Sequence, residues 1–109
     1  MSMEYASFST AQTGLEFVPG HAGEVIRVVM ILVTCWVSAK LTLLSDPGGD
    51  DERELAAPLY IGAGQPLLVR LGRHHALPAD PGRALGVTTS YQSTVAPLTL
   101  TVWYEWVQS

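Results

Sequence analysis

The residues of this 109-residue chain that could do chemistry include an acidic loop in mid-chain. Asp46–Glu54 (DPGGDDERE) holds five carboxylates in nine residues, and clustered carboxylates on a flexible loop can bind Ca²⁺. The spacing differs from that of an EF-hand loop, and Arg53 interrupts the run. A solvated turn is therefore the favoured interpretation, with a cation site as the alternative.

A second polar segment contains two adjacent imidazoles, His74 and His75, after Arg73. Neighbouring side chains on an extended chain point to opposite sides, so the pair is poorly placed to hold one metal ion. No cysteine or carboxylate stands at the helical spacing of a zinc motif. We expect no metal here, and predict that Arg73, His74 and His75 form an exposed loop that contacts a ligand or partner.

Catalytic motifs are not evident. The chain has no G-x-S-x-G elbow, and no Gly-rich loop precedes a helix to hold phosphate. Its single cysteine, Cys35, lies in an apolar stretch, so we interpret it as a buried hydrophobe and expect no internal disulfide. The prediction is a protein that is not an enzyme and carries no cofactor.

Composition narrows the class of function further. The net charge is −4 and the arginines are scattered, which argues against binding of nucleic acid. Hydrophobic residues make up 48% of the chain and charged residues only 15%, where a small soluble protein usually carries about 25–35% charge on its surface. So low a fraction of charged residues is typical of a subunit whose surface is partly buried against its neighbours in an assembly.

The apolar stretch Val25–Leu44 (VIRVVMILVTCWVSAKLTLL) must be assigned before the fold is predicted. Arg27 and Lys40 leave an uncharged run too short for a membrane helix, which needs about 20 apolar residues. The stretch is rich in β-branched residues, and it alternates after Trp36. We predict a strand over 24–34, a turn at 36–38, a second strand to about Ser45, and no membrane span.

The rest of the chain predicts short strands separated by Gly- and Pro-rich turns, seven or eight in all. No segment has a sustained helical stripe, and no linker divides the chain. We predict an all-β fold, an antiparallel two-sheet β-sandwich of jelly-roll type, as one domain over 1–109. Residues 1–12 read as a strand or an N-terminal arm, and their sequence lacks the pattern of a signal peptide.

Two strands carry apolar residues in excess of what one core requires. In the 24–34 segment both faces are apolar, and a strand of that kind is covered on both sides. In Leu98–Val107 the large Trp103 falls on the face lined by threonines. Aromatic residues are enriched at interfaces. The predicted oligomer interface therefore comprises Ile26, Val28, Met30, Leu32 and Trp103.

An alternative use of the aromatic residues is sugar binding, which jelly rolls often perform. It requires exposed Trp36, Trp103 or Tyr91 beside groups that form hydrogen bonds. We keep a carbohydrate-binding module as the second hypothesis.

Several patches in order along the chain carry a family resemblance: EFVPGHAG, EVIRVVMILVT, KLTLLSD, LAAPLYIGAG, ALPADPGRALGVTTS and TVWYEWV. From about Glu16 onward the chain resembles the small β-sandwich structural proteins of bacteriophage, prophage and gene transfer agent particles. The acidic insertion and the RHH segment depart from that pattern. The matching residues are Val18, Pro19, Gly23, Ile26, Arg27, Val28, Pro58, Leu59, Gly62, Gly64, Gly82, Ala84, Leu85, Gly86 and Ser90.

The resemblance implies a structural component of a virion or phage-like particle, of the head spike base or head decoration type. Such a protein would be assembled in the bacterial cytoplasm, form a homo-oligomer, and contact other capsid or fibre proteins. A position at a capsid vertex favours a pentamer, with a trimer as the alternative; closed cyclic symmetry is the general expectation. The resemblance supplies no catalytic residues.

Overall fold

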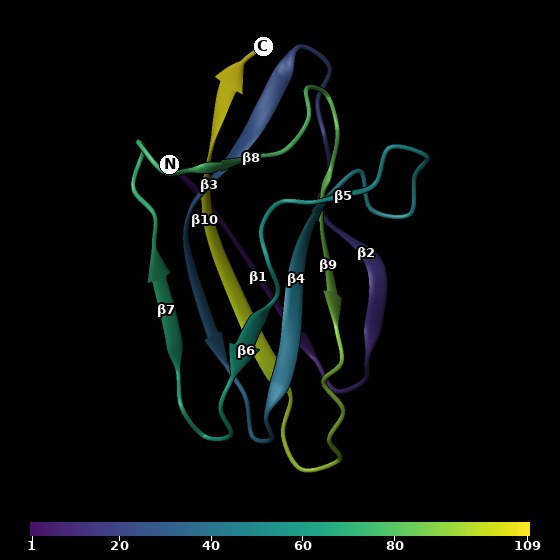
Figure 1. The fold of residues 1–109 in the computed structure, drawn as a ribbon, viewed down its shortest axis with the longest axis vertical. Coiled ribbons are helices and arrows are strands. Elements are labelled where there is room, and N and C mark those ends of the chain that lie inside the picture. The colour runs from purple at the N-terminus through teal and green to yellow at the C-terminus, as the bar shows by residue number, and fades with distance from the viewer.

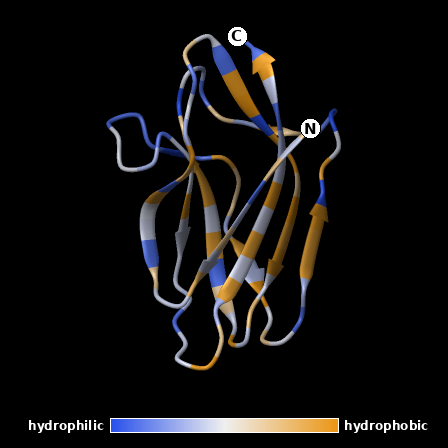
Figure 2. Ribbon diagram, turned by 180° about the vertical axis from the view of Figure 1, so that it is seen from behind, coloured by the Kyte–Doolittle hydropathy of each residue, from blue (hydrophilic) through white to orange (hydrophobic).

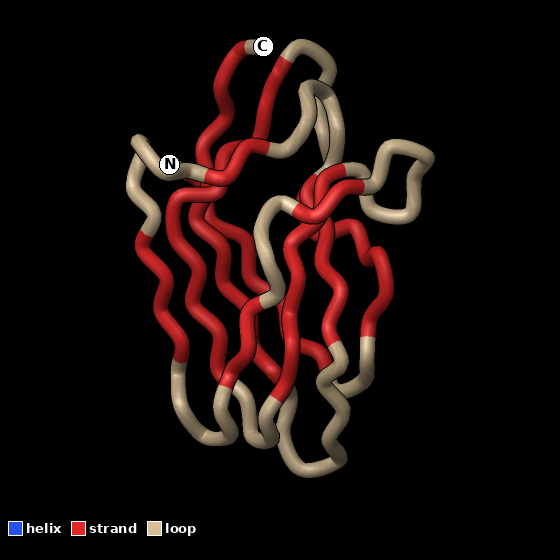
Figure 3. Tube along the Cα trace, in the orientation of Figure 1, coloured by secondary structure: helices blue, strands red, loops and turns tan.

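The computed structural model describes all residues, 1–109, as strands joined by turns and loops, with no helix (Figure 3). Ten strands form two antiparallel sheets packed face to face (Figure 1). The strands are β1 (Ser2–Phe8), β2 (Gln12–Val18), β3 (Glu24–Thr34), β4 (Ala39–Ser45), β5 (Arg53–Glu54), β6 (Leu59–Ile61), β7 (Leu67–Arg70), β8 (Leu77–Pro78), β9 (Leu85–Thr89) and β10 (Leu98–Gln108).

The first sheet has the order β1-β10-β3-β7, with β8 also paired to β3, and the second has the order β2-β9-β4-β5, with β6 also paired to β4. The predicted two-sheet β-sandwich is confirmed. The strand pairs β1 and β2, β3 and β4, and β9 and β10 each divide between the two sheets, as in a jelly roll. The jelly-roll assignment itself stays a prediction.

The core lies between the sheets and follows the period-2 alternation of the long strands. In β10, Leu98, Leu100 and Val102 are fully buried while the threonines between them are half-buried. In β9, Leu85 and Val87 are likewise at 0% exposure. Because alternate side chains point to opposite faces, each long strand gives one row to the core and one row to an outer face.

A β-bulge in β3 changes which residues make up its two faces. The pairing with β10 is continuous up to Trp103 with Met30, and then skips Val29, so that Tyr104 pairs with Val28. An extra residue reverses the alternation beyond it. Ile26 and Val28 therefore share the inner face with Ile31 and Val33, while Met30 and Leu32 lie on the outer face.

This bulge corrects two predictions. Ile26 and Val28 were expected at an oligomer interface, but they are exposed by 1% and 0% and belong to the core of the single chain. The 24–34 strand was also expected to be apolar throughout both faces. Part of that pattern is the shift in phase at Val29, which a strict alternation cannot represent.

Most other boundaries agree closely with the pattern-based assignment, but the strand predicted over 55–61 is limited to 59–61 and the one predicted over 15–18 begins at Gln12. Strand β3 spans 24–34 and β4 ends at Ser45, as predicted. Residues 2–8 form the edge strand β1, paired to β10 along its whole length. The structure holds more strands than expected, because β5 and β8 are two-residue pairings inside segments interpreted as loops.

Candidate functional site

The outer face of the β1-β10-β3-β7 sheet carries a continuous set of apolar side chains. Met3, Trp103 and Met30 stand in one cross-strand row, and Tyr5, Thr101, Leu32 and Leu68 stand in the next. Residues directly opposite on antiparallel strands share a face and lie within contact distance. We call this set the apolar face; it comprises Met3, Tyr5, Met30, Leu32, Leu68 and Trp103.

The apolar face is open to solvent in the single chain. Met3, Tyr5 and Leu68 are exposed by 57%, 56% and 45%, and Met30, Leu32 and Trp103 are half-buried by their neighbours. Figure 2 looks from the side opposite to Figure 1 and shows hydrophobic residues along β7 and the strands beside it. Three of the five predicted interface residues, Met30, Leu32 and Trp103, are thus brought together on one surface.

The acidic loop covers part of the outer face of the second sheet. Pro47 packs on Gly86 of β9, where an added Cβ would overlap the proline ring, and Gly48 and Glu52 lie against Gly14 of β2. Leu44, which points outward from β4, is only 4% exposed as a result. The acidic loop thus covers the outer face around β9, while Lys40 and Tyr60 on the same face stay exposed, and the apolar face of the other sheet carries no such loop.

The carboxylates of this loop act mainly within the loop. Asp46, in the left-handed region at φ 56°, accepts a hydrogen bond from the Asp51 amide at 3.1 Å, and Glu52 accepts one from the Gly48 amide at 2.8 Å. Arg83 pairs with Asp51 at 3.0 Å. The structure brings no three His, Cys, Asp or Glu residues together in a metal-binding group. The loop is therefore a folded turn that is stabilised by its own hydrogen bonds and by the ion pair with Arg83.

The Arg73–His75 segment lies in the turn after β7, at one end of the apolar face. All three residues are exposed. Arg73 Nε stands 3.5 Å from Glu105 Oε2, and the Arg73 carbonyl accepts a hydrogen bond from Arg27, which itself pairs with Glu105 at 3.6 Å. Arg73 is thus tied to the sheet, while His74 and His75 have no such partner among these contacts.

Groups that could act as nucleophile and base are not brought together. Cys35 follows the end of β3 and His21 precedes its start, so they lie at opposite ends of an 11-residue strand. The Cys35 thiol is 7% exposed, donates to the Gly62 carbonyl at 3.6 Å, and has its pKa raised by burial. Burial also raises the pKa of the Tyr104 hydroxyl, with a smaller contribution from the nearby Glu4 carboxylate.

Sequence reasoning missed an aromatic cluster near the C-terminus. The His21 ring stacks on Trp106 with centroids 4.4 Å apart and planes within 2°, and Tyr104 meets Trp106 edge-on at 5.9 Å. The loop that carries His21 is distant in sequence from β10. Alternation alone predicted the strand positions of Tyr104 and Trp106, but no local signal could pair them with this histidine.

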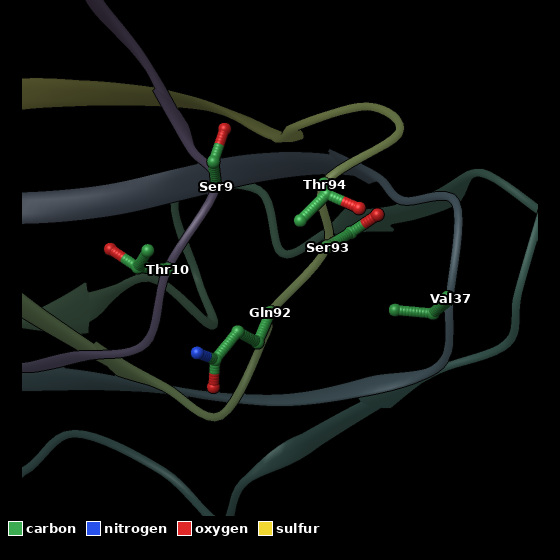
Figure 4. Close-up of a pocket in the computed structure, with 6 residues that line it drawn as sticks. All are labelled: Ser9, Thr10, Val37, Gln92, Ser93 and Thr94. Carbon is green, nitrogen blue, oxygen red and sulfur yellow. The ribbon is translucent and has the colours of Figure 1, made fainter.

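Two of the four hollows in the structure differ sharply in character. One, of about 110 Å³, lies between the sheets and is lined only by apolar residues: Ile31, Leu43, Ala56, Ala57, Leu59, Val69, Leu71 and Leu77. The other is an open concavity of about 750 Å³ at the end of the sandwich, lined by Ser9, Thr10, Val37, Gln92, Ser93 and Thr94 (Figure 4). Sequence analysis identified neither.

The aromatic residues considered for sugar binding occupy three different environments. Tyr91 is 1% exposed, so the expectation that it could present a ring to a ligand is wrong. Trp103 lies half-buried on the apolar face, and Trp36 is 58% exposed in the turn after β3. Trp36 directly precedes Val37 in sequence, and Val37 lines a polar concavity.

Searches of family models, of curated proteins and of solved structures found no match to this chain. None of its elements is a helix of the length and apolarity required to span a bilayer.

Proposed function

We propose that this protein is a structural subunit of a virion or phage-like particle, of the head spike base or head decoration type, and that it forms a homo-oligomer through the apolar face. The observation that carries the proposal is the bare cross-strand patch of Met3, Tyr5, Leu68 and Trp103 with its neighbours. Contiguous exposed apolar patches on small proteins mark interaction sites. The resemblance of the sequence to phage structural proteins supports the same role.

The contrast between the two sheets favours one face over the other. The acidic loop covers the outer side of β9 and β4 through Pro47 on Gly86. On the other sheet, Thr34 and Thr99 satisfy each other through a hydroxyl hydrogen bond. The neighbouring outer positions combine the hydroxyls of Ser7 and Thr101 with apolar side chains, and none of them is charged. A contact there buries little polar surface that lacks a partner, so desolvation costs little.

The composition of the apolar face fits an interface core. Met, Tyr and Trp are enriched in such cores, while Lys and Glu are depleted. The charged residues on this side stand at its edge: Arg70 in the row of Met30, and the pair of Arg27 with Glu105 beyond it. An apolar centre with a charged rim is the usual arrangement of a specific contact.

Oligomer symmetry follows from where the subunit would sit on a particle. A base at a capsid vertex would form a closed five-fold ring, with a three-fold ring as the alternative. The turn that carries His74 and His75 lies at one end of the same face, and in a ring it would recur around the axis. We assign this ring of turns to contact a neighbouring capsid or fibre protein.

The test is to follow the protein into particles from cells that encode it. Particles are purified on a density gradient, and this chain is quantified against the major capsid protein by mass spectrometry. The proposal expects it in the particle band at a fixed ratio, and expects Leu68→Arg to lower that ratio while Tyr60→Arg, on the other sheet, leaves it unchanged. Absence of the unmodified chain from the band would overturn the assignment.

A further inference from the structure

Three separate segments meet at the end of the sandwich where β3 runs into β4. They are the β1–β2 turn with Ser9 and Thr10, the β3–β4 turn with Trp36 and Val37, and the β9–β10 loop with 92–94. Figure 4 shows the six lining side chains on these segments around the concavity of about 750 Å³. That volume is within the range of small-molecule sites, about 300–1,000 Å³.

The frame of this concavity is held by a buried tyrosine. The Tyr91 hydroxyl donates to the Ala96 carbonyl at 2.6 Å and accepts from the Trp36 amide at 3.3 Å. The Ser93 amide donates to the Ser9 carbonyl at 3.0 Å. These bonds tie the three segments to one another, so the rim is ordered before any ligand arrives and less entropy is lost on binding.

The lining carries hydroxyl and amide groups and no charge. Ser93 Oγ accepts from the Val95 amide at 3.1 Å, and the Thr10 hydroxyl accepts from the Gln12 side-chain amide at 3.4 Å. The side chains of Ser9, Gln92 and Thr94 are left to bond an outside molecule. An amide offers two donors and two acceptor sites, and a hydroxyl both donates and accepts. These uncharged hydroxyl and amide groups suit a ligand that is rich in hydroxyls. They provide no charge that could neutralise an ionised ligand.

An exposed aromatic residue is next in sequence to one of the lining residues. Trp36 is 58% exposed and adjoins Val37, which lines the concavity. Its indole combines a broad apolar body with a polar tip, and the C–H face of a pyranose ring packs on such a surface. We propose that the concavity binds a neutral carbohydrate, whose hydroxyls bond Ser9, Gln92 and Thr94 and one of whose rings packs on Trp36. This site is separate from the apolar face and does not depend on oligomerisation.

The experiment titrates the full-length, ¹⁵N-labelled chain with three neutral hexasaccharides: a glucan, a mannan and a galactan. Each is taken to about 10 mM, where even a millimolar site is mostly filled. At least one sugar is expected to shift resonances of 9–10, 36–37 and 92–94 and to leave those of the apolar face unchanged. Raising the salt concentration should leave the affinity unchanged, because no charge lines the site.

Substitutions then assign the contacts. Gln92→Ala and Trp36→Ala should each weaken binding about tenfold, the loss expected for one good contact. Gln92 is exposed and makes no bond that the fold needs, so Gln92→Ala should keep the melting temperature. Trp103→Ala, which removes the half-buried tryptophan of the apolar face, should bind as the unmodified chain does.

Several results would overturn the proposal. These are no shift with any of the three sugars, shifts centred on Trp103 instead of the concavity, or unchanged affinity in both Gln92→Ala and Trp36→Ala. Binding that collapses at high salt would also contradict a neutral ligand. Failure here would leave the proposed oligomer untouched, since that is measured on Leu68→Arg.

Discussion

Trp103 of β10 stands directly opposite Met30 of β3 on the outer face of the sheet, at the last pair before the bulge. The bulge at Val29 decides this relationship, because it turns Ile26 and Val28 into the core and leaves Met30 outside beside the tryptophan. One extra residue thus places Ile26 and Val28 on the inner face and leaves Met30 on the outer face, where a partner can reach it.

The apolar face can be tested by placing a charge on it. Leu68 is 45% exposed, so Leu68→Arg should fold, yet it would bury an unpaired guanidinium in the proposed contact. We expect Leu68→Arg to be monomeric by light scattering at concentrations where the unmodified chain is not. The matched control is Tyr60→Arg, a 74% exposed site on β6, which should leave the mass unchanged. Equal masses for all three proteins would contradict the assignment.

The corrected position of Ile26 has its own consequence. Truncating a buried isoleucine removes transfer free energy and leaves a cavity, so Ile26→Ala should lower the free energy of unfolding by about 2–5 kcal/mol. Urea denaturation in the Leu68→Arg background measures this without a contribution from subunit dissociation. Val95→Ala, at a 69% exposed site, should stay within about 0.5 kcal/mol. A loss that small for Ile26→Ala would contradict the core position of Ile26 and support the sequence-based expectation that it lies at an interface.

Most of the fold could be predicted from the sequence because long strands have a strong local signal. The alternation of Leu98 to Val107 assigned both faces of β10, and the β-branched run before Cys35 gave the bounds of β3. The bulge could not be predicted from the sequence pattern. A run such as VVM looks the same whether Val29 is in register or skipped, and only the pairing with β10 decides it.

The surfaces were harder to predict than the strands. Met30, Leu32 and Trp103 could be selected by residue type, but their rows with Met3, Tyr5 and Leu68 depend on register between strands distant in sequence. The concavity is assembled from three turns, none of which has a motif of its own. Covering of the second sheet by the acidic loop also needed tertiary structure, since nothing local links Pro47 to Gly86.

The contact of Pro47 with Gly86 predicts a steric penalty. A methyl group at Gly86 would overlap the proline, so Gly86→Ala should lower the free energy of unfolding by about 1–3 kcal/mol. Adding Pro47→Gly should recover part of the loss. Gly62→Ala is the control, because its nearest neighbour would be 3.9 Å away, and it should change stability little. Equal effects of the two alanines in chemical denaturation would argue that the loop does not pack on β9.

Tyr91 is predicted to stabilise the end of the sandwich through its hydroxyl. Tyr91→Phe removes the donor to the Ala96 carbonyl and the acceptor for the Trp36 amide, and should cost about 1–3 kcal/mol. The same change at Tyr5, which is 56% exposed, should cost much less. Amide hydrogen exchange at Trp36 provides a local check, since it should accelerate in Tyr91→Phe and stay unchanged in Tyr5→Phe.

The buried thiol predicts a loss of stability at alkaline pH. Because burial raises the pKa of Cys35, the thiol loses its proton at a lower pH in the unfolded chain than in the folded one. As the pH rises above about 8.5, deprotonation therefore stabilises the unfolded state relative to the folded state. The contribution of the buried, protonated thiol to the free energy of unfolding is complete below that pH, and it is lost as the pH rises through the pKa of the thiol in the folded chain. The urea midpoint should therefore fall more steeply between pH 8 and 10 in the unmodified chain than in Cys35→Ala, by an amount set by the pKa shift. Parallel slopes would indicate that the thiol titrates alike in both states.

The central claim is that the apolar face is covered by further copies of this chain. Its most direct test is the mass of the unmodified protein by light scattering over a dilution series. The account predicts a constant mass that is a whole multiple of 11.7 kDa, five-fold by preference and three-fold as the alternative. A mass of 11.7 kDa at every concentration would contradict it.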